Sequence, residues 1–318
     1  MSILDRMDAE HRAVVEAIPT GFLDLSQLAK TRNLFNKTRR EMRSGKVPKG
    51  MKVKDYNVPG PEGSPQVMVR LYTPENLSQN TPALFWIHGG GMVLSAVEHD
   101  DELCMGRAAR LKIPVASVEY RLAPEYPFPA PLEDCYAGLK WFYKEADSFG
   151  IDPNRIAIGG ASAGGGLSAG LALLVRDRSE IKIAFQLLVY PMIDDRNQTE
   201  SSQRILDPRL WNRQANILGW NAYLNGTAGE EGVSPYAAPA RATDLEGLPP
   251  AYINVGDLDL FLDENIDYAR KLLSAGVPTE IHVYPGAFHG SNMFVSRSSL
   301  SKRWRDDEQE ALKRALFE

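Results

Sequence analysis

Short apolar runs alternate with helical stretches along most of this chain of 318 residues, and this alternation is the feature that most constrains its fold. Runs such as Ala83–His88 and Val115–Tyr120 do not alternate between apolar and polar residues, so they fit strands that are buried on both faces of a mostly parallel sheet. Strands that alternate with helices predict a doubly wound α/β sheet, and 43% hydrophobic residues are ample for a large core. The expected strands are Met51–Val58, Gln66–Tyr72, Ala83–His88, Val115–Tyr120, Arg155–Ile158, Ala184–Tyr190, Tyr252–Val255 and Thr279–Tyr284, and the expected helices are Asp101–Leu111, Leu132–Ser148, Leu167–Arg178, Glu264–Ala275 and Asp306–Phe317.

Two segments interrupt the alternation. Residues 1–45 have helical patterning and precede every expected strand, and residues 195–235 are polar and separate two strands. A long insertion without strands is usually a functional lid. We therefore expect a helical cap made of residues 1–45 and an insertion around 195–235, on a catalytic domain that spans 46–318. Trp211 and Trp220 in the insertion could line an acyl pocket or simply pack, and the sequence leaves both open.

Composition gives no reason to expect a polyanionic partner. Charged residues make up 24% of the chain and the net charge is -5, which favours neither a nucleic acid nor an anionic membrane as partner. The first residues include acids and form no apolar run, so we expect no secretory signal, no membrane span and, by default, a cytoplasmic location. Cys104 and Cys135 lack the paired spacing of a zinc site, so we expect two buried free thiols in helices.

The strongest local motif is Gly160–Gly164, with the sequence GASAG, between an expected strand and an expected helix. A serine nucleophile needs a sharp strand-to-helix turn, and small residues on both sides of Ser162 allow the backbone to turn that tightly. The helix amino terminus also favours developing negative charge. A plain glycine-rich turn is the alternative, and the strand–turn–helix context favours a nucleophile.

A second glycine pattern overlaps the first. Gly164–Ala169 matches the dinucleotide-binding pattern G-x-G-x-x-A. That pattern belongs at the strand-to-helix turn, whereas here it begins inside the expected helix. We therefore expect no nicotinamide cofactor.

The segment His88–Gly91 directly follows a buried strand and has the sequence HGGG. Acyl transfer generates an oxyanion that backbone N–H groups must stabilise, and glycine lets a loop expose its amides close to a substrate. We expect Gly90, Gly91 and Ala163, the residue after the nucleophile, to form the oxyanion hole. His88 is expected to brace this loop.

Chain order selects the general base. In α/β-hydrolases the order is serine, acid and then histidine. His11, His88 and His99 precede the serine, and His282 lies inside an expected strand. His289 follows that strand in a loop, where it can turn towards the cleft, so we expect it to be the base.

With these residues in place, the chain resembles the hormone-sensitive-lipase-like branch of bacterial carboxylesterases. Besides HGGG and GASAG, the segments Glu119–Glu125 (EYRLAPE), Phe128–Asp134 (FPAPLED) and Leu248–Pro250 (LPP) match that family, from about residue 50 to residue 290. Two features depart from it. The family usually has Asp or Thr where Ala161 stands. Its D-P-L-x-D-E-G segment corresponds to Asp259–Asn265 in this chain, which lacks the proline and the glycine.

The acid lies in the segment after the strand Tyr252–Val255. The resemblance assigns this role to Asp259, and Asp257, closer to the strand end, remains an alternative. Asp263 begins a stretch with helical periodicity, so we expect it to cap that helix. Glu264 would then lie solvated in the first turn, where negative charge is favourable.

The resemblance implies a carboxylesterase that hydrolyses short-chain acyl esters through Ser162, His289 and Asp259 and an acyl-enzyme, with no metal and no cofactor. The partner is then a small ester, and a homodimer through the sheet edge is possible. An amidase, lactonase or deacetylase would use the same triad. A small-molecule receptor on this fold is a further alternative, but such receptors have lost the histidine that this chain keeps.

Overall fold

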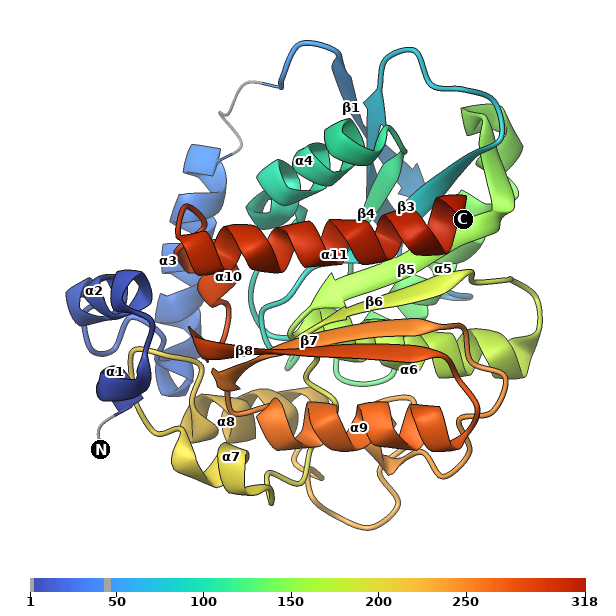
Figure 1. The fold of residues 1–318 in the computed structure, drawn as a ribbon. Helices are drawn as coiled ribbons and strands as arrows, with labels where there is room; N and C mark the ends of the chain where they lie inside the picture. The colour runs from blue at the N-terminus through green and yellow to red at the C-terminus, as the bar shows by residue number, and fades with distance from the viewer. Residues whose placement is uncertain (1–2, 43–46) are drawn as a thin grey trace.

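The computed structural model, which describes residues 3–42 and 47–318, is built on one sheet of eight strands (Figure 1). The strand order is β1-β2-β4-β3-β5-β6-β7-β8. Strand β2 is antiparallel to both of its neighbours, and all the other pairs are parallel. The strands are β1 (Met51–Val58), β2 (Val67–Pro74), β3 (Thr81–Ile87), β4 (Val115–Glu119), β5 (Ile151–Ala161), β6 (Phe185–Val189), β7 (Ala251–Leu258) and β8 (Thr279–Phe288).

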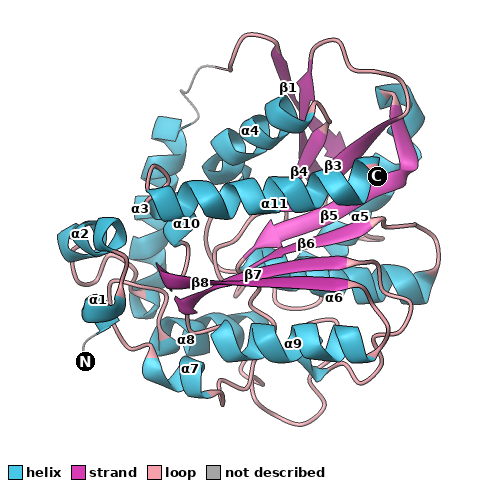
Figure 2. Cartoon of the chain, in the orientation of Figure 1, coloured by secondary structure: helices cyan, strands magenta, loops and turns pink. Residues whose placement is uncertain are grey.

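Helices cover both faces of the sheet (Figure 2). Helices α4 (Asp101–Leu111) and α11 (Ser299–Phe317) pack on one face, and α5 (Ala130–Lys144), α6 (Ala163–Arg178) and α9 (Leu262–Ser274) pack on the other. Neighbouring residues of β3 therefore enter different cores. Phe85 packs in the core on the side of α5, α6 and α9, Trp86 packs in the core on the side of α4 and α11, and neither is exposed. Burial on both faces explains why the strand sequences do not alternate.

The remaining helices lie beyond the carboxyl ends of the parallel strands (Figure 1). They are α1 (Ile3–Arg6), α2 (Ala9–Ala17), α3 (Leu28–Met42), α7 (Glu200–Arg204), α8 (Arg213–Tyr223) and α10 (Ser291–Phe294), with the short 3-10 helix η1 (Leu25–Gln27) in contact with α8. Met7 and Val15 of the amino-terminal segment pack with Leu210 and with Phe288 in one apolar cluster. The two segments that interrupt the strand–helix alternation thus meet at the same end of the sheet.

The eight expected strands and five expected helices are all present, and the differences lie at their ends. Strand β7 continues past Gly256 to Leu258, and β8 continues to Phe288, because the two strands still pair there beyond an irregularity. Helix α11 begins at Ser299 rather than at Asp306, since the side chain of Ser298 caps it by accepting from the Ser301 amide. Cys104 and Cys135 are free and buried in α4 and α5, as predicted. Within the described residues, no helix is long and apolar enough to cross a membrane.

A buried histidine anchors the amino-terminal segment to the rest of the chain. His11 of α2 is fully buried, and its Nε2 lies 2.9 Å from Ser298 Oγ and 3.3 Å from Ser301 Oγ at the start of α11. Its ring meets Phe288 edge-on at 5.8 Å. Burial lowers the pKa of His11 below its ordinary value of 6.5, against the opposing influence of Asp8 and Glu10.

This anchor makes the stability of the protein depend on pH. Because the pKa of His11 is lower in the folded than in the unfolded chain, the stabilisation is complete above about pH 6.5 and is lost as the pH falls towards the folded pKa. We expect the melting temperature of the natural protein to fall more between about pH 7.5 and about pH 5.5 than that of His11→Gln, which does not titrate. Equal falls in the two proteins would show that His11 is not the titrating anchor.

Candidate active site

Ser162 lies in the sharp turn between β5 and α6. Its backbone has φ +57° and ψ −119°, a conformation that residues other than glycine rarely adopt. Tight packing surrounds the turn: a Cβ atom at Gly160 would approach the carbonyl carbon of Gly164 to 2.3 Å, and one at Gly164 would approach Ile87 O to 2.0 Å. Glycine is required at both positions, and the predicted strand–turn–helix context of the pentapeptide is confirmed.

Three of the predicted site residues form one chain of hydrogen bonds. His289 Nε2 lies 2.9 Å from Ser162 Oγ, and His289 Nδ1 lies 2.7 Å from Asp259 Oδ2. Asp259 is fully buried, and its other oxygen accepts from the Phe261 amide at 3.0 Å. The serine follows β5, the aspartate follows β7 and the histidine follows β8, so the parallel strands bring all three to one edge of the sheet.

Asp257, the alternative acid, faces other partners. It lies on β7, where its Oδ1 accepts from the Gly286 amide at 2.7 Å and its Oδ2 pairs with Arg6 at 3.0 Å. These contacts tie the amino-terminal segment to the bend in β8. The hydrogen bond to His289 is made by Asp259 instead.

Aromatic rings enclose the imidazole of His289. Phe261 meets it edge-on at 5.0 Å and Tyr190 at 4.9 Å, and the ring of Trp211 lies 6.4 Å away. The Tyr190 hydroxyl donates to Asn292 Oδ1 at 3.0 Å, just beyond the histidine in the chain. These neighbours restrict the ring and leave it only 9% exposed, and no motif in the sequence indicated them.

The loop after β3 presents unpaired amides. Gly90 and Gly91 have φ values of +110° and +61°, and a Cβ atom at Gly91 would approach the Trp211 ring to 2.2 Å. Within the described part of the chain, the backbone N–H groups of Gly90, Gly91 and Ala163 have no hydrogen-bond acceptor. Ala163 is the first residue of α6, so its N–H group has no acceptor in the helix. All three amides belong to segments that flank Ser162.

His88 supports this loop through contacts with Tyr120 and Gly89. Its ring stacks on Tyr120 with centroids 4.2 Å apart and an angle of 14°, and its Nδ1 lies 2.8 Å from Gly89 O. Tyr120 also donates from its hydroxyl to His88 O at 3.0 Å. The expected bracing role fits these contacts, and a flexible surface loop does not, because His88 is fully buried.

The two tryptophans of the insertion have different surroundings. Trp220 is fully buried against Tyr223, with ring centroids 6.1 Å apart, whereas Trp211 borders Gly91 and His289. A buried amide pair orients Trp211: its Nε1 donates to Asn216 Oδ1 at 3.1 Å, and Asn216 Nδ2 donates to Asn197 Oδ1 at 2.6 Å. Sequence reasoning missed both asparagines, which belong to no motif.

The expected roles of two acids are wrong. Helix α9 begins earlier than expected, with Phe261 at its N-cap, so Asp263 does not cap it. Asp263 Oδ2 instead accepts from the Ser201 amide of α7 at 2.7 Å. Glu264 is only 3% exposed rather than solvated, and this burial raises its pKa well above the ordinary value. Helix α7 of the inserted segment packs against α9, which accounts for the contact of Asp263 with Ser201.

His282 and the second glycine pattern take no part in this chain of hydrogen bonds. His282 lies inside strand β8, as predicted, where it is half-buried with its Nε2 2.8 Å from Glu280 Oε1. Gly164–Ala169 lies within α6, so this glycine pattern is not at a strand-to-helix turn. Among the residues that the structure describes, no group of three or more His, Cys, Asp or Glu side chains could hold a metal ion.

Comparisons with known proteins agree with this architecture. A family model described as alpha/beta hydrolase fold matches residues 84–293. Carboxylesterase NlhH of Mycobacterium tuberculosis is 35% identical over 260 residues, 81% of each chain, and ethyl acetate hydrolase of Pseudomonas putida is 32% identical over 227 residues, 70% of each chain. Among solved structures, a bacterial heroin esterase superposes with a TM-score of 0.95 at 41% identity and covers 100% of both chains. Esterase LipW of Mycobacterium marinum gives a TM-score of 0.90 at 35% identity, with 99% of this chain and 98% of that chain covered.

The chain belongs to the α/β-hydrolase fold family, in its hormone-sensitive-lipase-like branch of carboxylesterases, and it is a serine carboxylic-ester hydrolase. The family, the fold and the enzyme class predicted from the motifs are confirmed.

Proposed function

We propose that this carboxylesterase hydrolyses short-chain acyl esters through a triad of Ser162, His289 and Asp259. The observation that carries the proposal is the continuous hydrogen-bonded chain from Ser162 Oγ through His289 to Asp259, with distances of 2.9 and 2.7 Å. An ionised Asp259 accepts from Nδ1–H, which leaves the lone pair of Nε2 free to accept the serine proton. Asp259 stays ionised and stabilises the imidazolium that forms.

The reaction proceeds in two halves. His289 takes the proton of Ser162 as the serine oxygen attacks the ester carbonyl, and the oxyanion accepts hydrogen bonds from the amides of Gly90, Gly91 and Ala163. The imidazolium then protonates the leaving alcohol, which departs and leaves an acyl-serine. Water repeats the sequence with His289 as base, and it releases the acid and the free serine. This chemistry needs neither a metal nor a cofactor.

The helices beyond the strand ends form the proposed cap over this centre. The proposed cap consists of residues 1–45, of which the structure describes 3–42, and the insertion around 195–235, and the catalytic domain is proposed to span 46–318. Ser162 and His289 are only 7% and 9% exposed, so a substrate has to enter beneath these helices. Trp211 borders both His289 and Gly91, where the group next to the ester carbonyl would lie, so this ring limits the acyl chain.

The names of the relatives favour esters over amides. Ethyl acetate hydrolase and heroin esterase are named for ester hydrolysis, and the former for an acetyl ester, which supports short acyl chains. An amidase, lactonase or deacetylase would require the same triad. A receptor without catalysis would not need the alignment of His289 with Ser162.

Replacing the nucleophile tests the mechanism directly. We expect Ser162→Ala to lower kcat on nitrophenyl acetate by about 10⁴- to 10⁶-fold, because the residual rate comes only from the oxyanion hole and binding. The far-ultraviolet circular dichroism should stay unchanged. Wild-type turnover in the purified variant would mean that another nucleophile operates.

Variants of three aspartates that lie close together in the sequence test which of them is the acid of the triad. We expect Asp259→Asn to lower kcat by about 10⁴-fold, as in serine proteases, because the amide cannot hold the required imidazole tautomer. Asp257→Asn and Asp263→Asn serve as matched controls and should keep most activity, since neither carboxylate bonds to His289 in the structure. A crippled Asp257→Asn beside a nearly normal Asp259→Asn would reverse the assignment.

Variants of Trp211 and Trp220 form a matched pair that tests what limits the length of the acyl chain. We expect Trp211→Leu to raise the ratio of kcat/KM for octanoate over acetate nitrophenyl esters by about tenfold, because added space in an apolar pocket is worth that much discrimination. Trp220→Leu removes a similar volume away from the centre and should leave the ratio unchanged. Using a ratio removes the effect of unequal folding. The same ratio in both variants would exclude Trp211 as the limit.

A further inference from the structure

The loop that carries Gly90 and Gly91 depends on outside support. Besides the two glycines, Met92 and Ser95 have φ values of +59° and +77°. L-residues rarely adopt this left-handed conformation, and they keep it only where the surrounding structure holds the chain. The positions of the Gly90 and Gly91 amides are therefore set by the contacts that hold this loop.

The catalytic domain supplies part of that support. Within the loop, the Leu94 amide donates to Gly90 O at 2.8 Å. From the segment after β4, the Tyr120 hydroxyl donates to His88 O at 3.0 Å, and the Ala123 amide donates to Met92 O at 2.9 Å.

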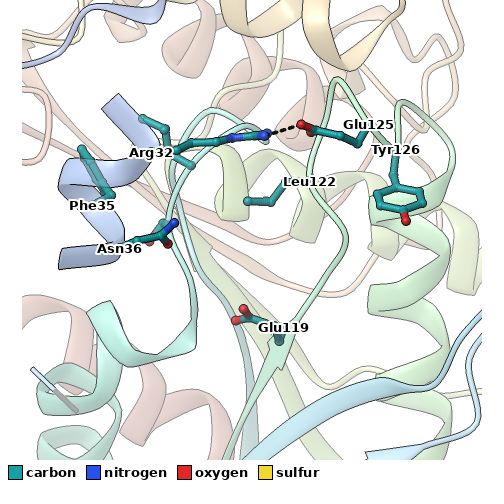
Figure 3. A pocket seen from close by; sticks show the side chains of 9 residues that line it. Arg32, Phe35, Asn36, Glu119, Leu122, Glu125 and Tyr126 are labelled. Carbon is teal, nitrogen blue, oxygen red and sulfur yellow. Dashed lines mark hydrogen bonds and ion pairs between the residues drawn. The ribbon is translucent and has the colours of Figure 1, made fainter. Parts of the chain in front are cut away.

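Arg32 of α3 supplies the rest from the amino-terminal segment. Its Nε donates to Val93 O at 2.8 Å, its Nη2 donates to Ala123 O at 2.5 Å, and its Nη1 donates to Glu125 Oε1 at 2.6 Å. Figure 3 shows its side chain reaching from the helix to Glu125. The guanidinium is planar and all three of its nitrogens are engaged, so its orientation is fixed.

The contacts of Arg32 and Ala123 form a closed circuit of hydrogen bonds at two residues of the loop, Met92 and Val93. Ala123 donates to Met92 O and accepts from Arg32, and Arg32 also donates to the next carbonyl, that of Val93. Of the two carbonyls that follow Gly91, Val93 O is thus held by the guanidinium itself, and Met92 O is held by Ala123, which the guanidinium contacts in turn. Without Arg32, Val93 O loses this donor and Ala123 is held less firmly against Met92.

We propose that Arg32 is a positioning residue for the oxyanion hole, and that the amino-terminal segment thereby contributes to the rate as well as to the enclosure of the substrate. This inference rests on the proposed function, because it needs Gly90 and Gly91 to be oxyanion donors. Arg32 also borders a cavity of about 290 Å³ with Phe35, Leu122 and Tyr126. Its three bonds to the protein favour positioning over substrate binding.

Four variants distinguish positioning of the oxyanion hole by Arg32 from substrate binding and from a purely structural role. We expect Arg32→Met to lower kcat at least about tenfold with KM nearly constant, since small displacements of oxyanion donors cost rate rather than ground-state binding. Arg32→Lys keeps one donor and should recover part of the loss. Glu125→Gln removes only the outer charge pair, and Arg12→Gln removes an exposed pair elsewhere in the same segment, so both should stay within about twofold of wild type. Active sites are counted with a fluorophosphonate, so kcat refers to folded enzyme.

A transition-state analogue provides the second readout. Phenylboronic acid adds to the serine and places an oxygen in the oxyanion hole, so its affinity for Arg32→Met should fall by the same factor as kcat/KM. If kcat per active site and boronate affinity are unchanged while the melting temperature falls, Arg32 only holds the segment in place and the inference is wrong. A rise in KM alone would make it a substrate contact, which also overturns the inference. Either result leaves the triad intact, whereas turnover by Ser162→Ala would overturn the proposed function itself.

Discussion

The packing of α6 against β3 fixes the position of Ser162, the proposed nucleophile, and the other residues of the proposed site are arranged around it. Gly164 lies so close to Ile87 O that no Cβ atom fits, and Ser162 is left with a positive φ at the end of β5. Strand β3 then continues directly into the glycine loop, so the same contact sets the distance between the serine and the amides of Gly90 and Gly91. Parallel strands end at one edge of the sheet, which brings Asp259 and His289 to this point from β7 and β8.

The segments outside the strand–helix alternation are held by polar contacts as well as by apolar packing. Asp263 at the start of α9 accepts from Ser201 of α7, and Asn216 of α8 orients Trp211 against the glycine loop. His11 joins α2 to the start of α11. The Asp263 contact joins α7 to the helix that follows Asp259, and Trp211, once oriented by Asn216, borders both Gly91 and His289. Small shifts of the helices would therefore reach the site through hydrogen bonds, which have a strict geometry.

Sequence reasoning predicted the fold and the site residues where the signal is local. The turn at Ser162, the glycine loop and the strand runs are each recognisable from a pattern of a few consecutive residues, even though contacts with distant residues hold the turn and the loop in place. The helix ends were less accurate: α11 starts at Ser299 because Ser298 caps it, and α9 starts before Asp263. The contacts of Arg32 with Val93 and of Trp211 with Gly91 join residues far apart in the chain, and no pattern in one sequence encodes them.

The need to keep backbone amides unpaired accounts for the many contacts that converge on the loop after β3. A buried N–H group without an acceptor costs stability, since it has lost its hydrogen bond to water. In the proposed oxyanion hole, the amides of Gly90, Gly91 and Ala163 remain available to the substrate only if the loop cannot relax and pair them internally. The bonds from Tyr120 and Ala123, together with the stack on His88, restrict that relaxation. In the proposed mechanism, donors held in advance need no rearrangement when charge develops on the substrate, which is the main way such a hole lowers the barrier. The rigidity of the loop is then a requirement of the chemistry as much as a property of the fold.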